Sequence, residues 1–233
     1  MHAAGARLES VYAGRERFAA SRYRSTSESV LLERQGLDRA LARAFRDLGW
    51  DALEHCRILD LGAGNGNLLL RLLTLGARAG NLVGVDLLRS RLRDGLERCP
   101  SLSLALADGC RLPFRDAVFD VATLCTVMSS VLEEGRRRAI ASEVRRVTRP
   151  GGAALWYDMR ITRPDNPNVR PAGHREASRY HPDCDVKSRT LTLAPVLSRP
   201  IAPLSSWAAD ALSRVPVLCG HRLTVIRFPR RAG

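Results

Sequence analysis

The stretch RILDLGAGNGNLLLRL, residues 57–72, carries three glycines between a short apolar run and a leucine-rich segment. The apolar run has the character of a buried strand, and the leucines after it recur at helical spacing. Gly62, Gly64 and Gly66 occupy alternate positions between these two elements. Because glycine in a packed segment costs conformational entropy, this spacing predicts either a sharp backbone bend or the close approach of another group.

Strand-like and helix-like segments alternate beyond this turn, which predicts a parallel sheet with crossover helices. The predicted strands span residues 57–62, 81–87, 102–109, 117–127 and 153–159, and the helices between them span residues 67–76, 89–99 and 133–148. After residue 160 come a proline-rich loop, one helical turn at 175–182, a strand at 185–195, a short helix at 203–216 and a last strand at 221–228. Two late strands after five parallel ones predict an antiparallel edge.

The 233-residue chain has a formal net charge of +13, and its cationic side chains are all arginine except Lys187. One interpretation is a polyanionic partner such as nucleic acid. The other is an arginine bias spread over solvated helix faces. No block of five basic residues occurs, which favours the second interpretation and makes a nucleic-acid partner unexpected.

Six cysteines lack the CxxC and Cys/His spacings of zinc sites, so we expect free thiols and no metal. The N-terminus has no apolar signal-peptide segment, and no apolar run approaches the roughly 18 residues of a membrane span. These features predict a cytoplasmic protein with no membrane partner, and they leave a monomer and a homodimer open.

Three aspartates end successive predicted strands, beginning with Asp60 just before the glycines. The glycine spacing differs from the G-x-G-x-x-G fingerprint of dinucleotide sites, and a carboxylate without a lysine suits a zwitterionic or cationic group better than a phosphate. Asp86 is placed to accept hydrogen bonds from a ribose diol. Asp108, beside Gly109, is placed to accept one from the amine of adenine. All three face the crevice at the carboxyl ends of the strands.

The motifs LDLGAGNG, LVGVD, ADGCRLPF, VFDVATL and VRRVTRPGG, within residues 50–160, resemble those of class I S-adenosylmethionine-dependent methyltransferases of the small-molecule, type 11-like group. The resemblance implies an α/β, Rossmann-like, doubly wound sheet of seven strands with an antiparallel last strand and an N-terminal helical cap. It implies S-adenosylmethionine as cofactor. The cofactor-binding residues that it implies are Asp60, Gly62, Ala63, Gly64, Asn67, Asp86, Leu87, Asp108, Gly109, Cys125 and Thr126.

By the same resemblance, residues 1–50 form the helical cap and residues 51–233 the methyltransferase domain, with substrate-lid insertions at about 161–185 and 198–219. The expected substrate-facing residues are Tyr23, Ser129, Asp158 and Arg160. Asp158 and His174 are candidates for a general base, which a hydroxyl acceptor would use. Each has a structural alternative, since Asp158 could cap a loop and His174 could lie on the surface. His221 is interpreted as structural.

The predicted function is methyl transfer to a small molecule, with a hydroxyl of a natural product as the expected acceptor. One alternative is a methyltransferase acting on RNA or another polyanion. The other is a non-catalytic cofactor-binding scaffold for an active partner.

Overall fold

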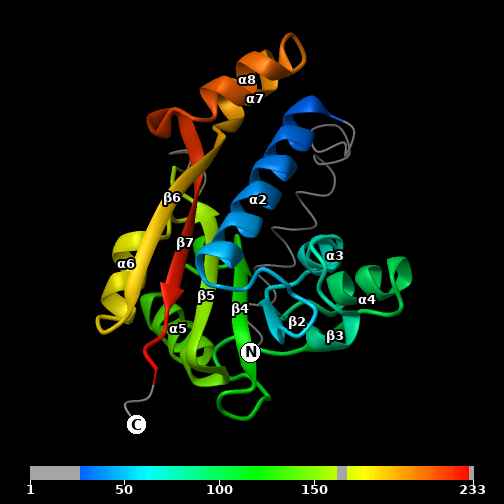
Figure 1. Ribbon diagram of the computed structural model, residues 1–233, viewed down its shortest axis with the longest axis vertical. Helices are drawn as coiled ribbons and strands as arrows, with labels where there is room; N and C mark the ends of the chain where they lie inside the picture. The colour runs from blue at the N-terminus through cyan, green and yellow to red at the C-terminus, as the bar shows by residue number, and fades with distance from the viewer. Residues whose placement is uncertain (1–26, 162–166, 231–233) are drawn as a thin grey trace.

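The computed structural model describes residues 27–161 and 167–230, whose strands form one seven-stranded sheet (Figure 1). The strand order is β3-β2-β1-β4-β5-β7-β6. The strands are β1 (Ile58–Leu61), β2 (Leu82–Asp86), β3 (Ser103–Leu106), β4 (Phe119–Cys125), β5 (Thr148–Met159), β6 (Asp185–Leu193) and β7 (Cys219–Arg227). Neighbours from β3 to β5 pair in parallel, whereas β7 is antiparallel to both β5 and β6. The predicted fold class is therefore confirmed.

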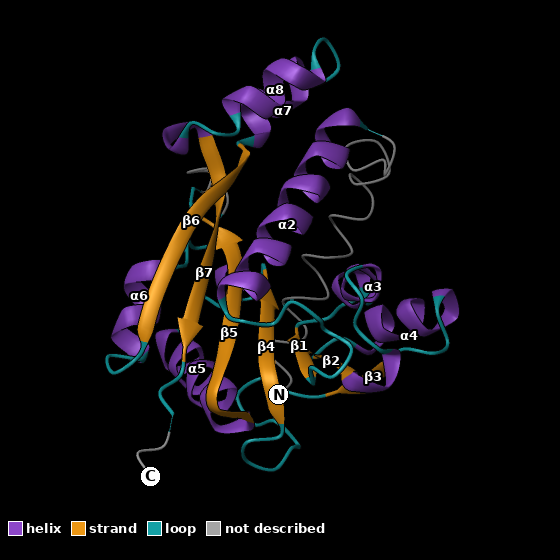
Figure 2. Cartoon of the chain, in the orientation of Figure 1, coloured by secondary structure: helices purple, strands orange, loops and turns teal. Residues whose placement is uncertain are grey.

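Helices cover both faces of this sheet (Figure 2). They are α2 (Glu28–Asp47), α3 (Asn67–Thr74), α4 (Arg89–Arg98), α5 (Glu134–Val147), α6 (His174–Tyr180), α7 (Pro195–Ile201) and α8 (Ser206–Leu212), with short 3-10 turns η1 (Ala79–Asn81), η2 (Met128–Ser130) and η3 (Pro216–Leu218). The apolar sides of α2 and α3 pack on one face, and those of α5 and α6 on the other. Within the described ranges, no helix has the length and apolarity that a bilayer crossing requires.

The glycine turn after β1 follows the sequence-based prediction. Gly62 and Gly64 both have positive φ, +77° and +54°, which disfavours any residue with a Cβ. A Cβ on Gly62 would overlap the side chain of Val127, and one on Gly64 would overlap the guanidinium of Arg91. The bend and the close approach are thus both present at this turn.

Several boundaries differ from the sequence-based prediction. Of the helical cap expected over residues 1–50, the structure describes α2, since residues 1–26 lie outside the described part of the chain. Strand β3 ends at Leu106, so Asp108 lies in the turn that follows it. Helix α7 was not predicted.

The two late strands form the antiparallel edge of the sheet that the sequence predicted. Strand β6 is the edge strand, and β7 lies between it and β5. Burial explains the order: most residues of β7 are buried, as suits an inner strand, whereas the first six residues of β6 alternate between exposed and half-buried.

Candidate cofactor and acceptor site

A cavity of about 560 Å³ lies where the carboxyl ends of β1, β2 and β4 meet. The crevice forms there because the strands on the two sides of β1 are reached by connections that run in opposite directions. Ten of the predicted cofactor residues line it: Asp60, Gly62, Ala63, Asn67, Asp86, Leu87, Asp108, Gly109, Cys125 and Thr126. The other predicted residue, Gly64, adjoins them through a hydrogen bond from its N–H to Asp86.

Asp60 is the most deeply buried acid of this cavity, at 1 % exposure. Its Oδ1 accepts a hydrogen bond from the Thr123 hydroxyl at 2.9 Å. Burial raises the pKa of Asp60 to about 7, with a smaller contribution from the nearby charge of Asp86, and the hydrogen bond from Thr123 opposes this rise. A buried carboxyl group of this kind would ionise readily beside a cationic ligand.

Asp86 ties the glycine turn to the end of β2. Its two carboxylate oxygens accept backbone N–H groups from Gly64, at 2.8 Å, and from Leu88, at 2.9 Å. Each oxygen retains a second lone pair. The carboxylate can therefore hold the turn in place and still accept hydrogen bonds from a ligand.

Asp108 forms a double contact with Arg136 of α5. The guanidinium lies 2.8 Å and 2.9 Å from the two carboxylate oxygens, and the Cys110 N–H donates to Oδ1. Burial alone would raise the pKa of Asp108, but these hydrogen bonds outweigh it and the pKa falls below its ordinary value. Arg136 lines the cavity and was not predicted, because the sequence RRR at 136–138 does not reveal which arginine faces inward.

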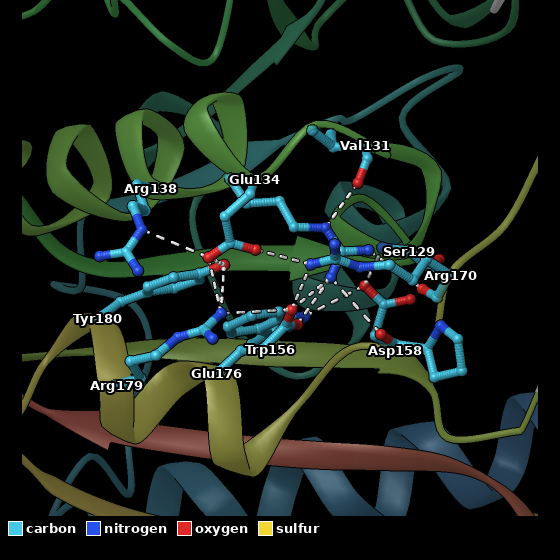
Figure 3. Close-up of polar contacts among 12 residues, drawn as sticks. Ser129, Val131, Glu134, Arg138, Trp156, Asp158, Arg170, Glu176, Arg179 and Tyr180 are labelled. Atoms are coloured by element: carbon cyan, nitrogen blue, oxygen red, sulfur yellow. Dashed lines mark hydrogen bonds and ion pairs between the residues drawn. The ribbon is translucent and has the colours of Figure 1, made fainter.

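The predicted substrate residues that the structure describes make contacts within the fold and do not line this cavity. Asp158, 1 % exposed, accepts hydrogen bonds from the Ser129 N–H, the Met159 N–H and the Trp156 indole (Figure 3). Burial raises the pKa of Asp158, and these hydrogen bonds oppose the rise. The carboxylate thus anchors the turn η2.

Two further candidates lie at the β6–β7 side of the sheet. Arg160 donates to the carbonyls of Val217 and Cys219, and His174 Nδ1 lies 3.1 Å from the Ser188 hydroxyl. Tyr23 lies outside the described residues. The acceptor roles of these residues remain predictions.

A buried polar pair lies one strand beyond the cavity wall, on β5 and β7. Tyr157 is the register partner of Cys125, and its ring stacks on His221 with centroids 5.0 Å apart. The Thr192 hydroxyl donates to the Leu191 carbonyl, so the Thr192 oxygen, 2.7 Å from His221 Nδ1, accepts the hydrogen of that nitrogen. When Nδ1 donates in this way, Nε2 keeps its lone pair.

The Tyr157 hydroxyl is buried and has no hydrogen-bond partner among the described residues. Burial raises the pKa of Tyr157 well above its ordinary value and lowers that of His221. The pair therefore offers a neutral phenol that can donate and a neutral imidazole that can accept. This arrangement could not be predicted from the sequence, because the two residues lie 64 positions apart on different strands.

Comparison with known proteins agrees with this geometry. Residues 58–152 match the family model described as a methyltransferase domain. Over 136 residues the chain is 37 % identical to demethylmenaquinone methyltransferase of Beutenbergia cavernae, covering 57 % of this chain and 51 % of the relative. Over 118 residues it is 35 % identical to 2-phytyl-1,4-naphtoquinone methyltransferase of Nostoc punctiforme, covering 48 % and 49 %. The chain spans about half the length of these curated relatives.

Two solved structures share the fold. The [4+2]-cyclase SpnF has a TM-score of 0.59 at 16 % identity and covers 83 % of this chain and 81 % of its own. A putative sarcosine dimethylglycine methyltransferase from Galdieria sulphuraria has a TM-score of 0.60 at 11 % identity, covering 83 % and 85 %. Residues 58–152 thus match a methyltransferase domain, and the strand order and the position of the cavity agree with that match.

Proposed function

We propose that the chain transfers the methyl group of S-adenosylmethionine to a small aromatic acceptor of the quinone type in its reduced, hydroxylated form. The observation that carries the proposal is the set of three carboxylates, Asp60, Asp86 and Asp108, around one cavity at the strand ends. The printed names of the relatives supply the acceptor class, and several are C-methyltransferases of ubiquinone and menaquinone biosynthesis. The acceptor atom is thus the ring hydroxyl that the sequence analysis expects, or the carbon beside it.

The cavity residues fit this cofactor in size and chemistry. A volume of about 560 Å³ lies in the range of small-molecule sites. The ionised Asp60 carboxylate would face the cationic amino group, Asp86 the ribose hydroxyls and Asp108 the adenine amine. When bound, the cofactor supplies a methyl group on a positively charged sulfur, which leaves as a neutral thioether.

The acceptor would bind beside Cys125, the register partner of Tyr157, and Thr126, whose N–H donates to the Tyr157 carbonyl. Methylation of a hydroxyl oxygen and of the adjacent ring carbon both become easier when the hydroxyl loses its proton, because the phenolate carries more electron density at both atoms. Nε2 of His221 would take that proton, and Thr192 holds the ring in the tautomer that allows it. The Tyr157 hydroxyl would donate a hydrogen bond to an acceptor oxygen.

The experiment is a transfer assay with radiolabelled S-adenosylmethionine and 1,4-naphthohydroquinone carrying an isoprenoid side chain. We expect a methylated quinol, with mass spectrometry and NMR showing whether oxygen or carbon received the methyl group. The His221→Asn variant should lower kcat about 100-fold or more, as expected for loss of a general base, with an unchanged Kd for S-adenosylhomocysteine. The Tyr157→Phe variant should raise KM for the quinol.

The Asp86→Ala variant is the matched loss-of-cofactor control. Removing its ribose contacts should weaken S-adenosylhomocysteine binding about 100-fold, at roughly 1.5 kcal/mol for each of two hydrogen bonds. Binding of S-adenosylhomocysteine without transfer to any quinol would overturn the acceptor assignment. Transfer to RNA instead, surviving 0.15 M salt, would replace it with the polyanion alternative.

A further inference from the structure

An unusual group of exposed apolar side chains lies on the segment that joins β6 to β7. In the described part of the chain nine large apolar residues are exposed, and five of them lie in residues 196–217. The four most exposed are Leu204 at 87 %, Trp207 at 80 %, Val196 at 77 % and Val217 at 70 %. We call these four side chains the apolar ridge.

The apolar ridge lies on helices that pack against the rest of the protein. Ala202 and Ala209 are buried, at 2 % and 1 % exposure, and Leu197, Ile201 and Leu212 pack against them half-buried. The Ser205 side chain accepts the Ala208 N–H at the start of α8. Some large side chains of these helices thus pack inward, whereas the four of the apolar ridge stay exposed although globular proteins usually bury such residues.

Hydrogen bonds from Arg160 hold the part of the ridge that contains Val217. The guanidinium of Arg160 donates to the carbonyls of Val217 and Cys219, which fixes the turn η3 against the end of β5. Figure 1 shows α7 and α8 beyond the carboxyl end of β6. Strands β6 and β1 run in the same direction, so their carboxyl ends lie at the same end of the sheet. The cofactor cavity also lies at that end.

The charges around the ridge are mainly positive. Between Pro195 and Leu218 the charged residues are Arg199, Arg214 and Asp210, and Arg39 of α2 reaches Asp210 at 2.7 Å. Three arginines against one aspartate give a local charge of +2 beside the apolar side chains. Apolar and aromatic side chains bordered by arginine are the composition of an interfacial membrane-binding surface.

The size of the ridge distinguishes a bilayer from a second copy of the chain. One exposed tryptophan and three exposed aliphatic side chains present on the order of 500 Å² of surface. A stable protein interface needs about 800 Å² from each partner. Insertion of a few side chains into a lipid headgroup layer has no such minimum area, and the positive charge favours anionic lipids.

We propose that the apolar ridge of α7, α8 and η3 is a peripheral membrane-binding face for bilayers that contain anionic lipid. The face inserts its side chains from the surface and does not span the bilayer. It would bring the edge that carries the cavity toward the lipid, where acceptors with long apolar chains reside. The proposal concerns association with the membrane and stands without the proposed methyl transfer.

The test uses the full chain and unilamellar vesicles of phosphatidylcholine, alone or with phosphatidylglycerol at three parts in ten, at 0.15 M salt. Co-sedimentation should show binding to the mixed vesicles that is at least tenfold stronger than binding to phosphatidylcholine alone. The Leu204→Ser/Trp207→Ser double variant should lose at least tenfold in affinity. The matched control is Leu96→Ser, which removes an exposed leucine from α4 and should bind like the wild type.

A second measurement places the ridge in the lipid. Vesicles with brominated acyl chains should quench the fluorescence of the wild type, and Trp207→Phe should remove most of this quenching while keeping the binding. The proposal is overturned if the wild type does not bind mixed vesicles, or if the double variant binds as the wild type does. It is also overturned if sedimentation velocity shows a dimer that Trp207→Ser dissociates, which would assign the ridge to a second copy.

Discussion

Arg137 donates to both carboxylate oxygens of Glu176, each at 2.7 Å, from a side chain with no solvent exposure. The same guanidinium donates to the carbonyls of Val131 and Arg170, so one buried cation links the start of α5, the loop after β5 and helix α6. Figure 3 shows Glu176, Arg170 and Glu134 gathered around this point. Because Val131 lines the cavity, the linkage also sets one wall of the cofactor site.

Replacing Arg137 with methionine should destabilise the fold by about 3 kcal/mol, because two carbonyls lose their donor and the half-buried Glu176 carboxylate keeps only Arg170 and Arg179 as partners. Urea unfolding followed by circular dichroism measures the free energy of unfolding. The control is Arg138→Met, whose exposed pairing with Glu134 should contribute less than about 1 kcal/mol. Equal losses in the two variants would contradict the special position of Arg137.

Asp60→Asn should change how stability and cofactor binding depend on pH. The raised pKa, about 7, means that the folded chain binds more protons than the unfolded chain between about pH 4 and pH 7, so the free energy of unfolding falls as pH rises through this range. The variant lacks this contribution. It should therefore become more stable than the wild type at pH 8, by up to about 4 kcal/mol, and similar to it at pH 4.

Cofactor binding should show the opposite trend. In the wild type, affinity for S-adenosylhomocysteine should increase as pH rises through about 7, because the ionised carboxylate faces the cationic amino group. Titration calorimetry of Asp60→Asn should show weaker binding with this increase removed. Asp120→Asn, a change at the far end of β4, is the control that should retain it.

Asp108 predicts a preference for the adenine amine. S-inosylhomocysteine has a carbonyl at that position, so it should bind 10-fold to 100-fold more weakly than S-adenosylhomocysteine, the loss expected when a charged acceptor loses its donor. In Asp108→Ala the difference between the two ligands should shrink to less than about threefold. An unchanged preference in the variant would assign adenine recognition to another group.

His181 should make the protein sensitive to mild acid. Its ring is 2 % exposed, and Nδ1 has no hydrogen-bond partner among the described residues. Burial, with a smaller effect of the Arg145 charge, lowers the pKa of His181 to about 4. Between about pH 6.5 and pH 4 the unfolded chain therefore binds more protons than the folded chain does. The free energy of unfolding falls as pH decreases through that range.

His181→Phe should remove most of this acid sensitivity, which we expect to be about 3 kcal/mol between pH 7 and pH 4. Thermal unfolding at both pH values measures it, and the phenyl ring would keep the edge contact with Phe228. The exposed His55→Gln variant should leave the wild-type pH dependence intact. If His181→Phe loses as much stability between pH 7 and pH 4 as the wild type does, another group causes the acid sensitivity.

The sequence could place the three aspartates at one cavity because each lies at or just beyond the end of its own strand and can be located from local pattern alone. Asp60, Asp86 and Asp108 needed no knowledge of the tertiary structure beyond parallel strands. The inward direction of Arg136 and Arg137 could not be predicted in the same way. Neighbouring arginines on a helix look alike until the packing of α5 is known.

The acceptor side was harder for a further reason. Tyr157 lies in the run AALWYDM, which is buried on both faces and so lacks the alternation that would assign its side. His221 becomes its neighbour only through the antiparallel register of β7 with β5. The prediction that Asp158 faces the acceptor rested on its place at a strand end, and the structure shows that its carboxylate accepts three hydrogen bonds from its own surroundings.

The position of β7 in the sheet also determines when its neighbouring strands can pair during synthesis of the chain. Strand β6 joins the sheet only through β7, which is made after it, so residues 185–193 leave the ribosome with no strand beside which they can pair. Strand β5 likewise keeps an open edge until residues 219–227 are available. At a synthesis rate of about 5–20 residues per second, the time between the synthesis of β6 and that of β7 is a few seconds. During this time β5 and β6 each expose unpaired backbone N–H and C=O groups, which can pair with another chain unless dilution or a chaperone prevents it.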